Sequence, residues 1–230
     1  MKTIGLIGGM SWESSLTYYR IINETVKARV GELHSAKSIL YSVDFAEIEI
    51  LQRKGEWAKA AQMLAEAAKS LERGGADFIV LCTNTMHKVA DEMQATVHIP
   101  LLHIADATAQ VVKAAGIQRI GLLGTRFTME EEFYKGRLAE KYGLQVSIPG
   151  QQEREIVHRV IYDELVLGKI RQTSKEQYSD IIAQMIAQGA EGIILGCTEI
   201  GLLIQQQDSQ VPLFDTTRIH AEAAVTYALA

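Results

Sequence analysis

The sequence predicts an α/β fold of two similar lobes, each with a mainly parallel sheet flanked by helices. Short apolar runs alternate with longer amphipathic stretches, which is the pattern of repeated βα units. Segments of the first half recur, in the same order, in the second half. A chain of 230 residues also suits two lobes of roughly 100 residues each.

The order of the elements follows from the position of the apolar runs. Strands are expected over Thr3–Ile7, Ser38–Val43, Phe78–Leu81, Leu101–His103, Ile120–Leu123, Val146–Ile148, Gly192–Leu195 and Leu213–Phe214. Helices fill the intervals, and the clearest helix is expected over Trp57–Leu71. Its apolar residues recur at helical spacing, and Gly74-Gly75 follow where a helix ends.

An internal duplication supports the two-lobe prediction. Ile4-Gly5-Leu6-Ile7-Gly8 is similar to Ile120-Gly121-Leu122-Leu123-Gly124, and the segment Gly75 to Thr83 is similar to Gly189 to Thr198. Ile99-Pro100-Leu101-Leu102 is likewise similar to Val211-Pro212-Leu213-Phe214. Each copy follows its match by about 115 residues, with a drift that small insertions explain. Chance similarity between apolar strands would not keep three matches in register.

Composition excludes several classes of protein. The formal net charge is −5, and no run of Lys or Arg resembles a nucleic-acid or membrane patch, so nucleic acid is not an expected partner. No apolar run approaches the roughly 20 residues that span a bilayer. The short apolar start predicts a strand rather than a signal peptide. We therefore expect a cytoplasmic protein with no membrane contact and no need of a disulfide.

Cys82 and Cys197 are the most informative residues. Each follows an apolar strand of the duplicated segments, at the end of the strand where open α/β sheets bind their ligands. An approximate two-fold axis between the lobes would point the two thiols at each other across a cleft. Inversion of a stereocentre requires one group to remove a proton and another to return a proton on the opposite face. The pair is therefore predicted to be the catalytic acid and base.

The residues beside the two cysteines predict how a substrate is held. A helix expected to start near Met86 would favour the Cys82 thiolate, since helix N-termini lower a thiol pKa from its reference of ~8.5. Thr83, Asn84 and Thr85 are expected to bind the substrate α-carboxylate, which accepts charge as the Cα proton leaves. Thr198 and Glu199 lie in the same place of the second half. Glu199 would hold the substrate ammonium or orient Cys197.

The same residues allow other interpretations. A cysteine after an apolar strand is often a small buried hydrophobe. Zinc would need Cys82, His87, Cys197 and His220 together, and their spacing is loose for a zinc site. Gly5-x-x-Gly8-Gly9 does not match the dinucleotide fingerprint. His87 and His103 are as readily core residues as proton carriers. No metal and no cofactor are expected.

Three segments resemble the aspartate/glutamate racemase family, which works without pyridoxal phosphate. They are Ile7-Gly8-Gly9-Met10-Ser11-Trp12-Glu13-Ser14, Cys82-Thr83-Asn84-Thr85-Met86-His87 and Gly196-Cys197-Thr198-Glu199. The resemblance is strongest to bacterial broad-specificity amino-acid racemases. It implies Rossmann-like lobes, an amino-acid substrate in the cleft between them, a homodimer, and a C-terminal segment that returns to the first lobe. We therefore assign 1–98 plus 214–230 to the first lobe and 99–213 to the second.

The resemblance also implies roles for individual residues. Cys82 and Cys197 match the two catalytic cysteines. The positions that match residues binding the substrate or lining the cleft are Met10, Gln52, Thr83, Asn84, Thr85, Thr125, Thr198 and Glu199.

The sequence departs from the family where specificity is decided. Where aspartate enzymes supply basic residues to the substrate carboxylate, the approximate register has Glu47 and Val166, and an anion facing an anion is unfavourable. Gly9-Met10 and Thr198-Glu199 replace the motifs of glutamate racemases. We expect broad specificity rather than strict aspartate or glutamate. Alternatives are a maleate isomerase, a hydantoin racemase, an arylmalonate decarboxylase, or a catalytically silent amino-acid-binding protein.

Overall fold

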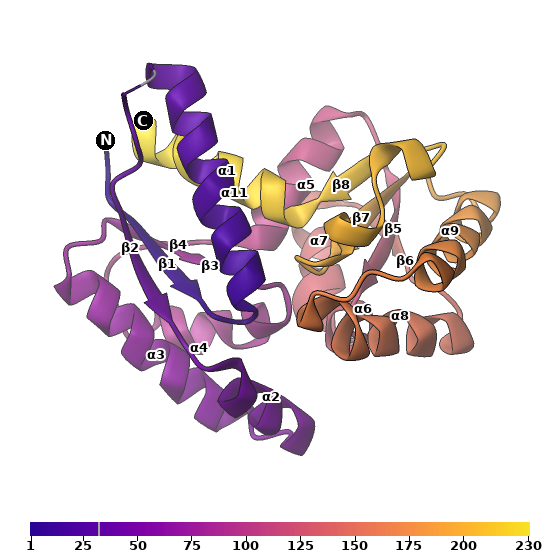
Figure 1. The fold of residues 1–230 in the computed structure, drawn as a ribbon, viewed down its shortest axis with the longest axis horizontal. Helices are drawn as coiled ribbons and strands as arrows, with labels where there is room; N and C mark the ends of the chain where they lie inside the picture. Colours follow the sequence, from indigo (N-terminus) through magenta and orange to yellow (C-terminus); the bar gives the residue numbers. More distant parts are fainter. Residues whose placement is uncertain (32) are drawn as a thin grey trace. The chain divides into compact units, whose positions relative to one another are not determined.

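The structure, a computed structural model, describes residues 1–31 and 33–230, which divide into two compact units. Unit 1 comprises Met1–Ile104 and His220–Ala230, and unit 2 comprises Ala105–Ile219. Each unit contains one four-stranded sheet with helices packed on it (Figure 1). The predicted α/β class with two lobes is confirmed.

The first sheet and its helices come from the N-terminal part of the chain and from its last helix. The elements are β1 (Ile4–Gly8), α1 (Trp12–Val30), β2 (Ser38–Ser42), α2 (Phe45–Lys54), α3 (Trp57–Arg73), β3 (Phe78–Leu81), η1 (Thr85–Val89, a 3-10 helix), α4 (Ala90–Gln94), β4 (Leu101–Leu102) and α11 (Thr216–Leu229). All neighbouring strands are parallel, in the order β2-β1-β3-β4.

The second sheet repeats this plan. The elements are α5 (Ile104–Ala114), β5 (Arg119–Gly124), α6 (Arg126–Glu130), α7 (Glu132–Tyr142), β6 (Gln145–Ser147), α8 (Gln151–Asp163), η2 (Leu165–Leu167), α9 (Gln172–Ala187), β7 (Gly192–Gly196), α10 (Ile200–Leu203), η3 (Gln206–Asp208) and β8 (Leu213–Asp215). The order β6-β5-β7-β8 is again parallel throughout and matches that of unit 1 strand for strand. Every expected strand is present with each end within one residue of the prediction.

The duplication extends to individual hydrogen bonds. Gln94 accepts the backbone N–H of Leu101 at 2.6 Å, and Gln206 accepts that of Leu213 at 2.9 Å. Each glutamine also donates its amide to the carbonyl two residues before that N–H, at 3.1 Å in both units. The start of the fourth strand in each sheet is therefore fixed by an equivalent glutamine clamp.

The chain also enters the third strand of each sheet by the same turn. Gly75 after α3 has φ +88° and Gly189 after α9 has φ +100°, a conformation that favours glycine. The next residue in each case, Ala76 or Ala190, donates its N–H back into the helix at 3.0 Å. The two units therefore share a common register from these glycines into β3 and β7.

The boundaries between the units differ from the predicted ones. The prediction put residues 99–213 in the second lobe, but β4 pairs with β3 and so completes the first sheet. It also began the return to the first lobe at residue 214, whereas β8 pairs with β7. The chain passes from unit 1 to unit 2 after Ile104 and returns at His220, within α11. The fourth strand of each sheet is short, and its pairing is what decides its unit.

Alternation along the strands gives each sheet two buried faces. On one face of unit 1, Phe78, Val80 and Cys82 pack with residues of α1 and α11. On the other, Ile79 and Leu81 pack with α3. In Figure 1, α1 and α3 lie on opposite sides of the first sheet. Strands buried on both faces explain the continuous apolar runs in the sequence.

In the described part of the chain, no helix combines the length and the apolar character that crossing a bilayer requires.

Candidate active site

Cys82 is the first residue after β3, as predicted, but its side chain points into the core of unit 1. The side chain is 0 % exposed and packs in the cluster that contains Ile4, Tyr18 and Val80. The thiol donates a long hydrogen bond, of 3.7 Å, to the Val80 carbonyl. Burial raises the pKa of the Cys82 thiol well above its usual range. These features are those of a packed thiol that stays protonated.

The helix expected near Met86 differs from the prediction. Residues Thr85–Val89 form a 3-10 helix, and the α-helix that follows is confined to Ala90–Gln94. Such a short turn has little dipole to offer a thiolate. The expected lowering of the Cys82 pKa by a helix is therefore wrong, because burial dominates and raises the pKa.

The register of the two sheets pairs Cys197 with Thr83 rather than with Cys82. Ile7 lies opposite Leu81 in unit 1, and Leu123 lies opposite Leu195 in unit 2. From these matched residues, Cys82 corresponds to Gly196, and Thr83 corresponds to Cys197. Strand β7 is one residue longer than β3. The sequence match of Cys82-Thr83 with Cys197-Thr198 is therefore displaced by one residue from the structural match of the two sheets.

Cys197 packs on the opposite type of sheet face from Cys82. It lies in the apolar cluster that contains Ile193, Leu195 and the buried apolar residues of α8 and α9. Helix α9 is the counterpart of α3, so Cys197 follows the face that Ile79 and Leu81 occupy in unit 1. Every second residue of the strand faces the same side, so Thr83 is the next residue after Ile79 and Leu81 on that face. It is buried, and its hydroxyl makes no hydrogen bond to another described residue.

Glu199 connects the polar side chains at the end of β7. The Cys197 thiol donates to Glu199 Oε2 at 3.0 Å, and the Thr198 hydroxyl donates to the same oxygen at 2.8 Å. Burial first, and then the Glu199 carboxylate, raise the pKa of the Cys197 thiol. Cys197 is 8 % exposed. The thiol keeps its proton and donates it in a hydrogen bond to the carboxylate, and the arrangement brings three predicted residues together.

The neighbouring strands carry further predicted residues. Thr125 follows β5, whose last residue Gly124 lies opposite Gly196, so Thr125 and Cys197 stand at adjacent strand ends. The Thr125 hydroxyl caps α6 by accepting the Thr128 N–H at 3.3 Å. Thr125 is thus placed beside Cys197 by the sheet.

In unit 1 the predicted residues fall into two groups. Thr83, Asn84 and Thr85 are all buried directly after β3. Gln52, on α2, donates to Met86 Sδ at 3.0 Å and so reaches the same loop. Met10 packs in the apolar cluster of the α3 face.

Glu47 and Val166 stand where the resemblance to aspartate racemases predicts basic residues, and neither is basic. Glu47 is exposed in the first turn of α2. Val166 lies in η2 and packs against the core of unit 2.

The two histidines of the zinc alternative are already fully engaged. Among residues 1–31 and 33–230, no group of three or more His, Cys, Asp or Glu side chains is placed to hold a metal ion. His220 bonds Tyr18 Oη at 2.9 Å and the Leu102 carbonyl at 2.8 Å. His87 likewise uses both ring nitrogens. A metal would have to displace these bonds, which argues against the zinc interpretation.

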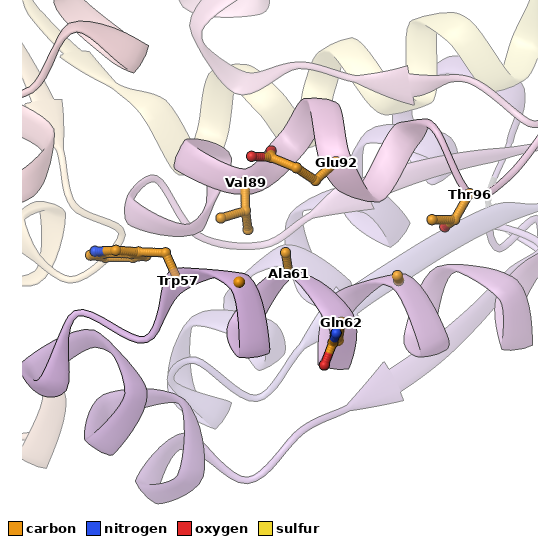
Figure 2. A pocket seen from close by; sticks show the side chains of 8 residues that line it. Trp57, Ala61, Gln62, Val89, Glu92 and Thr96 are labelled. Carbon is orange, nitrogen blue, oxygen red and sulfur yellow. The ribbon is translucent and has the colours of Figure 1, made fainter.

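A hollow of about 330 Å³ lies between α3 and α4 of unit 1 (Figure 2). Its lining residues are Trp57, Ala58, Ala61, Gln62, Ala65, Val89, Glu92 and Thr96. None of the predicted site residues is among them. We therefore do not assign the site to this hollow.

Duplicated parallel sheets with proton-bearing side chains at matched strand ends suit an enzyme that moves protons. Sequence comparison gives the particular family. The family model for Asp/Glu/hydantoin racemases matches residues 7–224. The chain belongs to this family, and it is a racemase.

Individual relatives agree with this assignment. The broad-specificity amino-acid racemase RacX of Bacillus subtilis is 26% identical over 174 residues, which cover 73% of this chain and 71% of the relative. A solved structure of a candidate Asp/Glu racemase from Yersinia pestis is 61% identical with a TM-score of 0.93, and each chain is covered to 100%. An aspartate racemase homologue from Pyrococcus horikoshii is 37% identical with a TM-score of 0.86, again over 100% of both chains.

Proposed function

We propose that the protein interconverts the mirror-image forms of amino acids without a cofactor, using one proton carrier from each unit. The observation that carries this proposal is the Cys197–Glu199 pair at the end of β7, with a proton-bearing side chain in the matched position after β3. Removal of the Cα proton by one carrier and delivery of a proton to the opposite face by the other inverts the stereocentre.

Cys197 acts as the base for one enantiomer, with Glu199 as its proton acceptor. The thiol proton moves to Glu199 Oε2 along the 3.0 Å hydrogen bond, and the thiolate then takes the Cα proton. A substrate ammonium near the sulfur would offset the effect of burial, since a neighbouring cation lowers a thiol pKa. The same logic activates other enzymatic nucleophiles through an adjacent base.

For the second carrier, the sequence predicts Cys82, whereas the register favours Thr83. The Cys82 thiol is enclosed by apolar side chains on the α1 and α11 face. Thr83 is the register counterpart of Cys197. We therefore propose the Thr83 hydroxyl as the group that exchanges a proton with the opposite face of Cα. Its O–H bond breaks as the new Cα–H bond forms, and the proton taken up by Glu199 then returns through solvent to the Thr83 oxygen.

The two proposals for the second carrier are separated by variants of adjacent residues. Thr83→Val removes the hydroxyl and should lower the racemisation rate at least about a hundredfold, the usual size of an acid–base contribution. Thr83→Ser retains the hydroxyl and should keep most of the rate. Cys82→Ala should stay within about threefold of wild type in rate and lose about 1–2 kcal/mol of stability from its packed site.

The measurement is incubation of L- and D-amino acids in deuterated water without added cofactor. Cα deuterium and the opposite enantiomer should appear together for the wild type, and Cys197→Ser should abolish racemisation. A Cys82→Ala variant that loses racemisation, beside a Thr83→Val variant that keeps it, would restore the two-cysteine mechanism. Ligand binding without any Cα exchange would leave only a silent binding protein.

The substrate range is proposed to be broad. An exposed Glu47 and a core-packed Val166 supply no cation to a substrate carboxylate, and RacX is itself described as broad in specificity. Racemisation rates of homoserine and methionine should equal or exceed that of aspartate under matched conditions. A clear preference for aspartate or glutamate would overturn this part of the proposal.

A cytoplasmic homodimer is proposed as the working form, in line with the family resemblance. Light scattering at micromolar concentration should give twice the mass of 25.4 kDa. A monomer with full activity would refute the dimer.

A further inference from the structure

His87 links Thr83 to a second segment of unit 1 by hydrogen bonds. Its Nδ1 bonds the Thr83 carbonyl at 2.8 Å, and its Nε2 bonds the backbone N–H of Ile104 at 3.2 Å. The side chain is 3 % exposed. Both partners are main-chain groups, so the imidazole is held between two fixed points.

The partners determine the protonation of the ring. A backbone N–H only donates, so Nε2 must accept from Ile104 and carries no proton. A carbonyl only accepts, so Nδ1 carries the hydrogen that bonds Thr83. His87 is therefore a neutral imidazole in a single tautomer, with no free ring nitrogen for proton transfer.

Both main-chain polar groups of Thr83 are held. Its N–H donates to the Leu81 carbonyl at 2.9 Å, and its carbonyl accepts from His87 at 2.8 Å. A residue fixed through its N–H and its carbonyl has a fixed Cα–Cβ direction, because the two peptide planes on either side are set. The direction of the Thr83 side chain thus depends on His87.

We propose that His87 is a positioning residue that aims the Thr83 hydroxyl for proton transfer. This rests on the proposed function, in which that hydroxyl exchanges a proton with Cα. Small errors in placing a reacting group lower the rate strongly, by up to about a hundredfold for roughly 1 Å. Loss of the bond from Nδ1 should therefore lower kcat, while substrate groups bound elsewhere keep KM nearly constant.

Replacing His87 by each of two amide residues tests the roles of its two ring nitrogens separately. His87→Asn carries an amide nitrogen where Nδ1 stands and keeps a donor for the Thr83 carbonyl. His87→Gln reaches the position of Nε2 and keeps a partner for Ile104, but removes the bond to Thr83. We expect kcat of His87→Gln to fall between about ten- and a hundredfold with KM within about threefold, and His87→Asn to stay within about threefold in both.

His220 supplies a matched control. It is also buried in unit 1, and its ring contacts the His87 ring, but both of its ring nitrogens bond Tyr18 and Leu102 rather than Thr83. His220→Gln should lower thermal stability to a similar extent and leave kcat per folded molecule unchanged. Thermal unfolding of all variants gives the folded fraction at the assay temperature.

A second measurement reports on Thr83 directly. In deuterated water, Cys197 removes and returns the Cα proton on one face even when the second carrier is misplaced. His87→Gln should therefore raise the ratio of deuterium exchange with retention to racemisation, and Thr83→Val should do the same. A merely structural role would lower both rates together.

The outcomes distinguish this inference from the function on which it rests. Failure of the folded wild type to racemise any amino acid would overturn the proposed function. A racemising wild type with His87→Gln unchanged in kcat, or with His87→Asn impaired more than His87→Gln, would overturn the positioning role alone.

Discussion

At the scale of single residues, His220 is a buried neutral histidine whose environment makes stability depend on pH. Tyr18 Oη donates to Nδ1, and Nε2 donates to the Leu102 carbonyl. Burial lowers the pKa of His220 from 6.5 to about 4. A proton on Nδ1 would face the tyrosine donor without a solvent shell, so the folded state resists protonation.

The sign of the pH effect follows from the lowered pKa. Above pH 6.5 both folded and unfolded chains keep His220 neutral. As the pH falls toward 4, the unfolded chain binds the proton and the folded chain does not, so stability is lost, by up to about 3 kcal/mol. Urea unfolding of wild type and His220→Gln across this range should show a shallower loss in the variant. Parallel curves would contradict the prediction.

Residue identities at the site were predictable, but their geometry was only partly so. The sequence predicts Thr83, Thr198 and Glu199, and the structure joins Glu199 to both Cys197 and Thr198 by hydrogen bonds. The match between the cysteines hid a shift of one residue, because Thr83 lies as many residues after Gly75 as Cys197 lies after Gly189. An ungapped alignment from those glycines would have found it. The strand pairing was needed to choose between the two alignments.

At the scale of elements, the glutamine clamps carry a measurable part of the sheet stability. Gln94 is half-buried and Gln206 is exposed, although their hydrogen bonds are equivalent. Gln94→Ala leaves a shielded backbone N–H and carbonyl unpaired and should cost about 1–3 kcal/mol, while Gln206→Ala, where water replaces the amide, should cost about 1 kcal/mol or less. Chemical unfolding of the two variants measures the difference. Equal losses would contradict the role assigned to burial.

The elements themselves were predictable where the pattern is long or duplicated. All strands and the helix after Trp57 follow from apolar periodicity, and α3 extends only to Arg73 beyond the expected Leu71. The turn after Cys82 was not predictable, because residues Thr85–Val89 suit either a 3-10 or an α-helix locally. Packing of Met86 and Val89 into the core decides between them.

At the scale of the whole molecule, the two units differ in how the chain builds them. Unit 2 is continuous over Ala105–Ile219 and has its own apolar core. Unit 1 needs a second segment, since Ala221, Ala224 and Val225 of α11 complete the core beneath β1 and β3. The sequence predicted a discontinuous first lobe, but the weak pattern of the short β4 and β8 strands did not fix where the chain crosses.

This difference predicts how fragments of the chain behave. A fragment of residues 105–219 should unfold cooperatively on heating, with the circular dichroism of an α/β protein. A fragment of residues 1–104 should not, because it lacks apolar side chains worth several kcal/mol of burial. Adding a peptide of residues 216–230 should restore a cooperative transition. Cooperative unfolding of 1–104 alone would show that α11 is dispensable.

The shift of one residue between the ends of β3 and β7 has a thermodynamic consequence for the proposed reaction. Mirror-image amino acids have equal free energy in water and pass through the same transition state, so kcat/KM must be equal for the two enantiomers, however unlike the proton carriers are. A thiol and an alcohol as proton carriers can therefore make kcat and KM differ between the enantiomers, through the stability of the bound states, but cannot change the ratio kcat/KM. Unequal kcat values must be matched by equally unequal KM values, and the enantiomer that turns over faster is the one that saturates later.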